Sequence, residues 1–183
     1  VLNGDAVELD AKKRSQQVIT TSQEKAIEIA NETYEPFFEL CKSVYVIRGT
    51  EAHTGMSAQA EEAIAGNFEN AVRNEETGTA SWWYLPMICE GVKIDIAHHP
   101  KGGGGGRPQA KQNLINRIAS DTLFEYADRG EIAPRLVIRS HLHTYQDSLA
   151  AYRTRAIITP AMSLLTAFGH RIGLNVNNDI GAI

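Results

Sequence analysis

The sequence predicts a single α/β domain that covers residues 1–183, and two observations support this prediction. First, short apolar runs alternate along the chain with longer segments whose apolar residues recur at helical spacing, an order typical of α/β layering. Second, polar or imidazole side chains follow directly after several of the apolar runs, and ligands of α/β folds bind beyond the carboxyl ends of strands. A chain of 183 residues can also bury a substantial core.

In chain order, the first half contains two predicted strands and two predicted helices. Residues 1–3 are the end of a strand, and residues 44–47 (Val-Tyr-Val-Ile) are continuously apolar, as in strands buried on both faces. Helices are predicted at residues 22–42 and 57–74, because each segment begins with a serine suited to capping. Pro36 is expected to kink or divide the first of them.

The second half contains four predicted strands and one predicted helix. Residues 90–91 (Glu-Gly) suit a turn that joins the first two strands. Five consecutive glycines at 102–106 predict a loop in front of the helix. The strands are expected at 81–85, 92–97, 136–138 and 155–159, and the helix at 108–128.

Composition limits the kind of protein. Apolar and charged contents of 43% and 22% are ordinary for a globular chain, and a net charge of −4 gives no indication of bulk nucleic-acid binding. No apolar run approaches the roughly 20 residues that span a bilayer, so no membrane partner is expected. Cys41 and Cys89 have apolar neighbours and are interpreted as buried thiols, which favours a cytoplasmic location. The oligomeric state is left open.

Five of the six histidines lie in three clusters, each at the end of a predicted strand. These are His53, the pair at 98–99, and the pair His141 and His143. Asp5 likewise follows the first apolar run. Neutral nitrogen and anionic oxygen are the preferred ligands of divalent transition metals, so the pattern predicts a metal-dependent hydrolase.

The two neighbouring histidines at 98–99 are expected to differ in role. Side chains of consecutive residues on extended backbone point to opposite faces, so at most one of them faces the site. Pro100 keeps His99 extended, and His98 is therefore the predicted ligand. His99 is expected either to contact a metal ligand without binding the metal itself or to lie on the surface.

Taken together, these blocks resemble the calcineurin-like metallophosphoesterase superfamily, and specifically its bacteriophage or prophage-type branch. The family pattern runs Asp-x-His, Gly-Asp-x-x-Asp/Glu, Gly-Asn-His-Asp/Glu, a lone His and Gly-His-x-His. Residues 4–8 (Gly-Asp-Ala-Val-Glu) match the second block, with Glu8 at its acidic place. His98 matches the lone histidine, and residues 140–143 match the last block with Ser140 in place of glycine. The resemblance covers most of the chain.

Two blocks depart further from the family pattern. The first block would lie upstream of Val1, so we expect the chain to be truncated at its N-terminus. In the third block, residues 49–53 read Gly-Thr-Glu-Ala-His. Either Thr50 and Glu51 take the Asn and His places, or two residues are inserted and His53 supplies the histidine. We favour His53, because an imidazole can act as acid and hydrogen-bond donor near neutral pH. Glu51 then substitutes for the asparagine ligand, unless it is an ordinary surface side chain.

The resemblance implies a four-layer α/β/β/α sandwich, incomplete at the N-terminus, and two divalent metal ions, either Mn²⁺, Fe, Zn²⁺ or Mg²⁺. It implies that Asp5 bridges the two ions, that His98 and His141 bind one of them, and that His143 binds the other. The implied reaction is hydrolysis of a phosphomonoester or phosphodiester by a metal-activated hydroxide. His53 would stabilise the developing charge or protonate the leaving oxygen.

Substrate contacts are predicted from cationic residues near these blocks. Lys101 and Arg107 flank the glycine run, whose backbone amides can approach a phosphate closely, although a surface loop without such contact is the plainer interpretation. Arg48 precedes the altered third block. The implied substrate is a phosphate ester, and nucleotides and nucleic acids are candidates because residues 82–84 (Trp-Trp-Tyr) can stack on a base. Their alternation fits a core strand better.

Two other functions fit the same residues. One is a single-metal hydrolase of another class, similar to amidohydrolases, that uses His141 and His143. The other is a non-catalytic metal-binding or scaffold module, in which the altered third block marks lost activity. The number of bound ions separates the first from a phosphoesterase, and inertness of the metal-loaded protein would favour the second.

Overall fold

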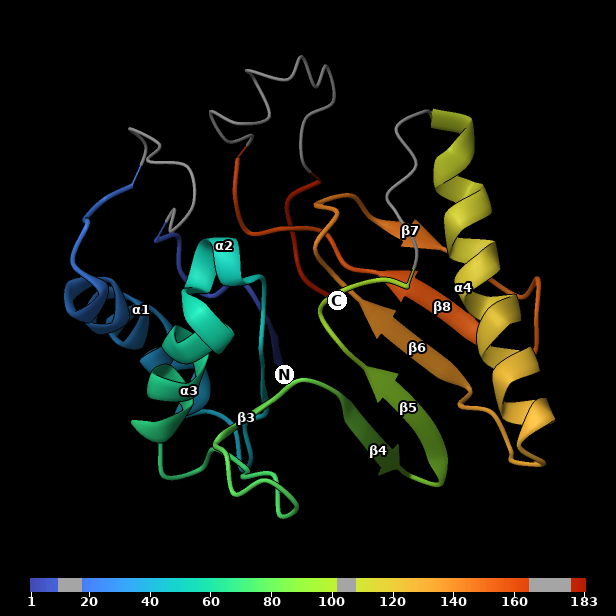
Figure 1. Cartoon of the computed structure of the whole chain (residues 1–183), viewed down its shortest axis with the longest axis horizontal. Coiled ribbons are helices and arrows are strands. Elements are labelled where there is room, and N and C mark those ends of the chain that lie inside the picture. Colours follow the sequence, from blue (N-terminus) through green and yellow to red (C-terminus); the bar gives the residue numbers. More distant parts are fainter. Residues whose placement is uncertain (10–17, 102–107, 165–178) are drawn as a thin grey trace. The chain divides into compact units, whose positions relative to one another are not determined.

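The computed structural model describes residues 1–9, 18–101, 108–164 and 179–183. These residues form two compact units. The first comprises residues 1–9 and 18–83, and the second comprises residues 84–101, 108–164 and 179–183. Each unit combines a sheet with at least one helix, which confirms the predicted α/β class (Figure 1). A single domain would require the two units to pack together and fold as one, and this part of the prediction stays a prediction.

The sheet of the first unit has three parallel strands in the order β1-β2-β3. Val46 and Ile47 form the central strand and are fully buried, as a continuously apolar run predicts. Leu2 and Ser81 pair with Val46 from either side. The strands are β1 (Leu2–Asn3), β2 (Val46–Ile47) and β3 (Ser81–Trp82).

The long helix of this unit begins where its cap was predicted. α1 (Gln23–Phe38) is preceded by Ser22, whose side chain accepts a hydrogen bond from the Lys25 amide at 3.3 Å. Pro36 lies in the last turn, so the helix ends shortly after it. Phe38 then packs with β2 in the core of the unit, and α1 contacts α3 (Gln59–Gly66) (Figure 1).

The second predicted helix, residues 57–74, is wrong at both ends. Ser57 and Ala58 have left-handed φ values of 55° and 52°, which interrupt a right-handed α-helix, so Ser57 is not the cap and α3 begins at Gln59. The helix ends at Gly66. The preceding residues instead form a single helical turn, α2 (Glu51–Thr54), and a short 3₁₀ turn, η1 (Met56–Ala58).

The sheet of the second unit has five strands in the order β4-β5-β6-β8-β7. The three inner strands are parallel, and the two edge strands are antiparallel to their neighbours. Glu90 and Gly91 join the first two strands with φ values of 47° and 77°, as a tight hairpin turn requires. The strands are β4 (Leu85–Cys89), β5 (Val92–Ile96), β6 (Leu136–Arg139), β7 (Gln146–Asp147) and β8 (Arg155–Ile158).

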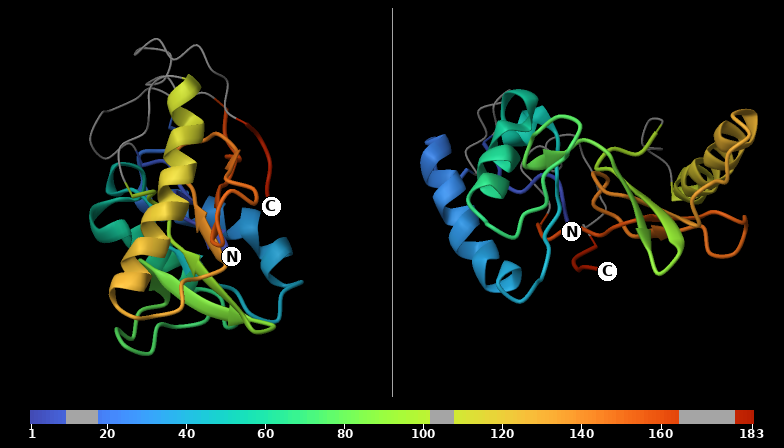
Figure 2. Two further views of the ribbon diagram at one scale, coloured as in Figure 1. Left: turned by 90° about the vertical axis from the view of Figure 1, so that its right-hand side faces the viewer. Right: turned by 90° about the horizontal axis from the view of Figure 1, so that it is seen from below.

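One face of this second sheet is covered by α4 (Pro108–Asp128), which connects the parallel strands β5 and β6 (Figures 1 and 2). Ile115 and Ile118 of the helix are buried against Val137 and Ile158 of the sheet, as apolar residues three positions apart on one helix face would be. Among the residues that the structure describes, neither α4 nor any other helix combines the length and apolarity needed to cross a membrane.

Two predictions of burial were wrong. Cys41 and Cys89 are both exposed free thiols, because one lies beyond the end of α1 and the other on the edge strand β4. The predicted strand 81–85 is divided: its first two residues form β3, and Leu85 begins β4. Trp83 and Tyr84 lie on the connection between them and are 50% and 42% exposed, so they are not core residues.

Candidate metal centre

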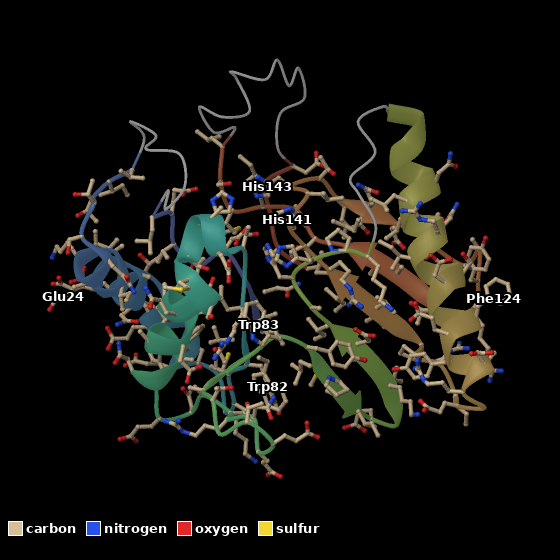
Figure 3. All side chains as sticks on the ribbon, in the orientation of Figure 1. Glu24, Trp82, Trp83, Phe124, His141 and His143 are labelled. Carbon is tan, nitrogen blue, oxygen red and sulfur yellow. The ribbon has the colours of Figure 1, made fainter. Side chains whose placement is uncertain are left out.

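In the second unit, the ends of two parallel strands bring histidines together. β5 ends at Ile96, and the chain continues into His98 and His99; β6 ends at Arg139 and continues into His141. The Ser140 amide donates to the His98 carbonyl oxygen at 2.8 Å, which holds the two segments side by side. Figure 3 shows His141 and His143 on the segment that follows β6.

Three imidazoles form a compact cluster, which we call the histidine cluster: His98, His99 and His141. Their ring centroids lie 4.9 Å apart for His98 and His99, 5.3 Å for His98 and His141, and 4.8 Å for His99 and His141. His98 is only 2% exposed, His141 is half-buried, and His99 is exposed. The cluster therefore extends from the interior of the unit to its surface.

The donor set of this cluster fits a divalent transition metal. One ligand atom from each histidine lies within 4.8 Å of the others. Two nitrogens bound tetrahedrally to one ion at about 2.1 Å are about 3.4 Å apart, so side-chain rotations that bring the rings closer would close the set. Three imidazoles are the ligands that zinc and related ions take in catalytic sites.

The structure places the His99 ring beside the rings of both His98 and His141, although at most one of the neighbouring histidines was expected to face the site; the role of His99 stays a prediction. The argument that neighbouring side chains point to opposite faces holds only within a strand, and β5 has already ended at Ile96. His98 and His99 lie in a bend, which allows both rings to face His141. Within the described ranges, His143 is not a member of this group of three.

In the first unit, Asp5 lies at the end of β1, against the loop that follows β2. Gly4 and Asp5 turn the chain with φ values of 80° and 53°. The Asp5 carboxylate accepts hydrogen bonds from the Thr50 amide at 2.6 Å and the Thr50 hydroxyl at 3.4 Å. Gly49 is packed so tightly here that a Cβ on it would lie 2.2 Å from the Asp5 amide nitrogen.

His53 and Glu8 form a pair at the same edge of the first sheet. His53 lies on α2, and its Nδ1 atom is 2.5 Å from Glu8 Oε2. The Leu9 amide also donates to the His53 carbonyl oxygen at 2.7 Å. A carboxylate against Nδ1 holds the imidazole ring in one orientation. The interpretation that His53 supplies the histidine of the altered block stays a prediction.

Glu61 is a buried side chain whose place the sequence did not indicate. It is fully buried in the first turn of α3. Its Oε1 atom accepts a hydrogen bond from the Ala6 amide at 3.2 Å. Burial raises the pKa of Glu61, and the nearby Asp5 raises that pKa further. Glu61 therefore supports the backbone directly after Asp5.

The remaining predicted site residues have structural contacts. Arg48 donates to Ser81 Oγ at 2.8 Å and to Glu62 Oε2 at 3.1 Å. Glu51 accepts a hydrogen bond from the Ser57 amide at 3.2 Å. The roles of Arg48 in substrate binding and of Glu51 as a ligand stay predictions.

Of the two cations that flank the glycine run, the structure describes Lys101 but not Arg107. Lys101 Nζ lies 2.5 Å from Glu125 Oε2 on α4. Arg107 and the glycines at 102–106 lie outside the described residues. Substrate binding by Lys101 and Arg107 stays a prediction.

The predicted ligands thus fall into two sets. Asp5, Glu51 and the predicted catalytic residue His53 belong to the first unit, whereas the predicted ligands His98, His141 and His143 belong to the second. Each set lies at the carboxyl ends of parallel strands, as predicted. A centre shared by both sets stays a prediction.

Neither the models of known protein families nor the curated proteins contain a match to this chain. The functional interpretation therefore depends on the residues and their geometry. The histidine cluster is the part of that geometry that points most directly to chemistry.

Proposed function

We propose that this protein is a metal-dependent phosphoesterase. The observation that carries the proposal is the histidine cluster at the carboxyl ends of β5 and β6. The three imidazoles lie close together but differ in burial. A metal ion bound there would be held by the buried His98 and would still be accessible to a substrate from solvent. The order of the motifs along the chain, from residues 4–8 to residues 140–143, supports a phosphate ester as the substrate.

The proposal assigns a role to each predicted ligand. His98 and His141 hold one ion, with His99 as an additional ligand, and Asp5, Glu51 and His143 complete a two-ion centre. A bound divalent ion supplies charge for the phosphoryl oxygens and makes water a better nucleophile near neutral pH. The proposed ions are Mn²⁺, Fe, Zn²⁺ or Mg²⁺, because mixed nitrogen and oxygen ligands accept all of them.

His53 is the proposed catalytic acid. An imidazole can carry a proton near neutral pH and deliver it from Nε2 to the leaving oxygen of the ester. Glu8 lies against Nδ1, which keeps Nε2 directed away from the carboxylate. The pair therefore supplies an oriented proton donor at the edge of the first sheet.

The same proposal includes the finer features implied by the resemblance. The two units would be the halves of a four-layer α/β/β/α sandwich, and the protein would act in the cytoplasm, as a phage-type enzyme does in its host cell. Substrates would be phosphomonoesters or phosphodiesters, nucleotides and nucleic acids among them.

The deciding experiment measures metal binding and hydrolysis together on the full-length gene product. We expect Mn²⁺ to support hydrolysis of bis-p-nitrophenyl phosphate or p-nitrophenyl phosphate. His98→Ala and His141→Ala should each lower metal affinity and hydrolysis by at least about a hundredfold. Phe124→Ala, at a 73% exposed position of α4 in the same unit, is the matched control and should change neither. Unchanged metal affinity in both histidine variants, or inertness of the metal-loaded protein, would contradict the proposal.

One observation favours a second candidate, a single-metal hydrolase of another class. The histidine cluster contains three protein ligands in one place, which is the number that a one-ion catalytic site uses. The metal content of the purified full-length protein separates the candidates. Two ions per chain support the phosphoesterase, and one tightly held ion supports the alternative.

A further inference from the structure

A polar cavity adjoins the histidine cluster in the second unit. It has a volume of about 280 Å³ and lies between the sheet and α4. His99 lines this cavity and also belongs to the cluster, so the two sites share a wall. Tyr84, Asp95 and Tyr126 line it as well. No role in the proposed metal chemistry accounts for these three side chains.

The cations in the wall of the cavity are each paired with a carboxylate. Lys101 lies 2.5 Å from Glu125, and Arg129 lies 3.4 Å from Glu131. Arg139 lies 2.8 Å from Asp95, and this third pair is buried, with side-chain exposures of 6% and 8%. An anionic occupant would have to compete with these carboxylates. Because each of these cations already has a carboxylate partner, a neutral occupant is favoured over a second phosphate group.

Besides the paired cations and His99, the polar groups of the wall are hydroxyls and carboxylates. The Tyr84 hydroxyl donates to Asp95 Oδ2 at 3.1 Å and lies 3.4 Å from the Tyr126 hydroxyl. Burial raises the pKa of Tyr84, and the adjacent Tyr126 and Asp95 raise it further, so its hydroxyl keeps its proton. Paired donors and acceptors of this kind recognise the hydroxyl groups of a ligand, and they discriminate against ligands that lack them.

The size of the cavity restricts the occupant further. A volume of about 280 Å³ equals that of about nine liquid water molecules, enough for one sugar ring and its hydroxyl groups. We propose that this cavity binds the neutral, hydroxyl-rich alcohol group of the substrate, either a sugar or the ribose of a nucleoside. The position of the phosphate at the histidine cluster rests on the proposed function. The cavity would then make sugar phosphates better substrates than aryl phosphates.

The first experiment tests the cavity without metal or phosphate. The full-length protein, labelled with ¹³C in its tyrosine rings, is titrated with methyl β-D-ribofuranoside and separately with adenosine. We expect the ring resonances of Tyr84 and Tyr126 to shift, while those of Tyr152 do not, because Tyr152 is exposed elsewhere in the same unit. Stronger binding of adenosine would identify a nucleoside site, and equal binding a sugar site. Absence of shifts at both cavity tyrosines with both ligands would overturn the proposal.

The second experiment measures the contribution of the sugar to affinity. Calorimetric titrations of the Mn²⁺-loaded protein compare ribose 5-phosphate with inorganic phosphate. We expect ribose 5-phosphate to bind about fivefold or more tightly, the contribution of one or two neutral hydrogen bonds. Tyr84→Phe should remove this advantage without changing the affinity for inorganic phosphate, and Tyr152→Phe should preserve it. Tyr126→Phe is the second variant if Tyr84→Phe does not fold.

The two experiments separate failure of the cavity from failure of the proposed function. Binding of the riboside without any metal-dependent binding of inorganic phosphate would support the cavity and contradict the phosphoesterase. Binding of phosphate with no riboside shifts and no advantage of ribose 5-phosphate would do the reverse. An advantage that persists in both Tyr84→Phe and Tyr126→Phe would also overturn the cavity proposal.

Discussion

Three of the predicted metal ligands have backbone conformations that L-residues seldom adopt. The φ values of Asp5, His141 and His143 are 53°, 71° and 56°. A residue held in this region costs about 1–3 kcal/mol, and such residues concentrate at functional sites. Here they follow directly after β1 and β6, where a tight turn directs the side chain past the end of the sheet. Glu90 and Leu149, which belong to no proposed site, have the same conformation, so the assignment of the three predicted ligands to a site stays a prediction.

Gly49 provides a test of how tightly the Asp5 turn is built. We expect Gly49→Ala to lower the free energy of unfolding by about 1–3 kcal/mol, because its Cβ would lie 2.2 Å from the Asp5 amide nitrogen and 2.3 Å from its carboxylate. The measurement is urea denaturation followed by circular dichroism. Gly66→Ala is the control, because nothing lies within 4 Å of a Cβ at that helical position. Equal stability of the two variants would show that the turn at Asp5 has room for a Cβ atom on residue 49.

A second test concerns whether Glu8 orients the imidazole ring of His53. We expect His53→Ala to lower kcat for an aryl phosphate by about 10²-fold or more, as loss of a general acid does. Glu8→Gln should have a smaller effect, because it leaves the imidazole in place but weakens the contact at 2.5 Å. Steady-state kinetics of both single variants and the double variant check this.

If the two side chains act together, the double variant is no worse than His53→Ala. Fully additive effects would instead show that Glu8 acts independently of His53. An activity of His53→Ala equal to that of the unchanged protein would remove His53 from the reaction.

At the scale of elements, the edge of the second sheet is held by a charged pair. Arg155 on β8 binds Asp147 on β7, with the two nitrogen–oxygen contacts at 2.5 and 3.0 Å. Hydrogen bonds from Arg155, and in addition from the Leu149 amide, lower the pKa of Asp147 to about 2. The residues of β7 give no apolar pattern, so this strand was not predicted; its pairing with β8 and this ion pair define it.

This ion pair predicts a contribution to stability that depends on pH. Because the pKa of Asp147 is lower in the folded chain than its unfolded value near 3.8, the contribution is complete above about pH 4 and is lost as the pH falls toward 2. We expect about 1 kcal/mol, since Arg155 is half-exposed and solvent screens the pair. Denaturation of Asp147→Asn between pH 5 and pH 2 should lack this loss.

Asp121→Asn, an exposed acid on α4, is the control for general effects of charge at low pH. It should keep the acid-dependent loss of the unchanged protein. If Asp147→Asn follows the same curve as the control, the ion pair does not stabilise the edge of the sheet.

At the scale of the whole molecule, the two units can be followed separately. The chain has two tryptophans, Trp82 and Trp83, and both belong to the first unit. The histidine cluster belongs to the second. Tryptophan fluorescence therefore reports unfolding of the first unit, while circular dichroism reports both.

The prediction of a single domain requires that the two probes give coincident transitions. Metal at a hundred times its dissociation constant should raise the free energy of unfolding by about 2.7 kcal/mol, and both probes should show the increase. His98→Ala should lose it. A fluorescence transition that does not respond to metal, beside a dichroism transition that does, would show two domains that unfold independently.

Prediction from sequence succeeded where the determining interactions are local. The cap at Ser22, the buried strand at Val46 and Ile47, and the helix at residues 108–128 all follow from capping chemistry and from the spacing of apolar residues. It failed where backbone turns override that spacing. Ser57 resembles a helix cap, yet its left-handed φ moves the start of α3 to Gln59.

The order of amino acids by itself determined the α/β class and the placement of His98 and His141 after strands, because both depend on patterns within a few residues. Only the tertiary structure decided that His99 joins those two histidines, that Glu8 meets His53, and that a cavity forms beside the cluster. The physical reason is that these contacts depend on which strands pair and in what register. Glu8 and His53 are 45 residues apart in the sequence, so no local sequence pattern predicts their contact.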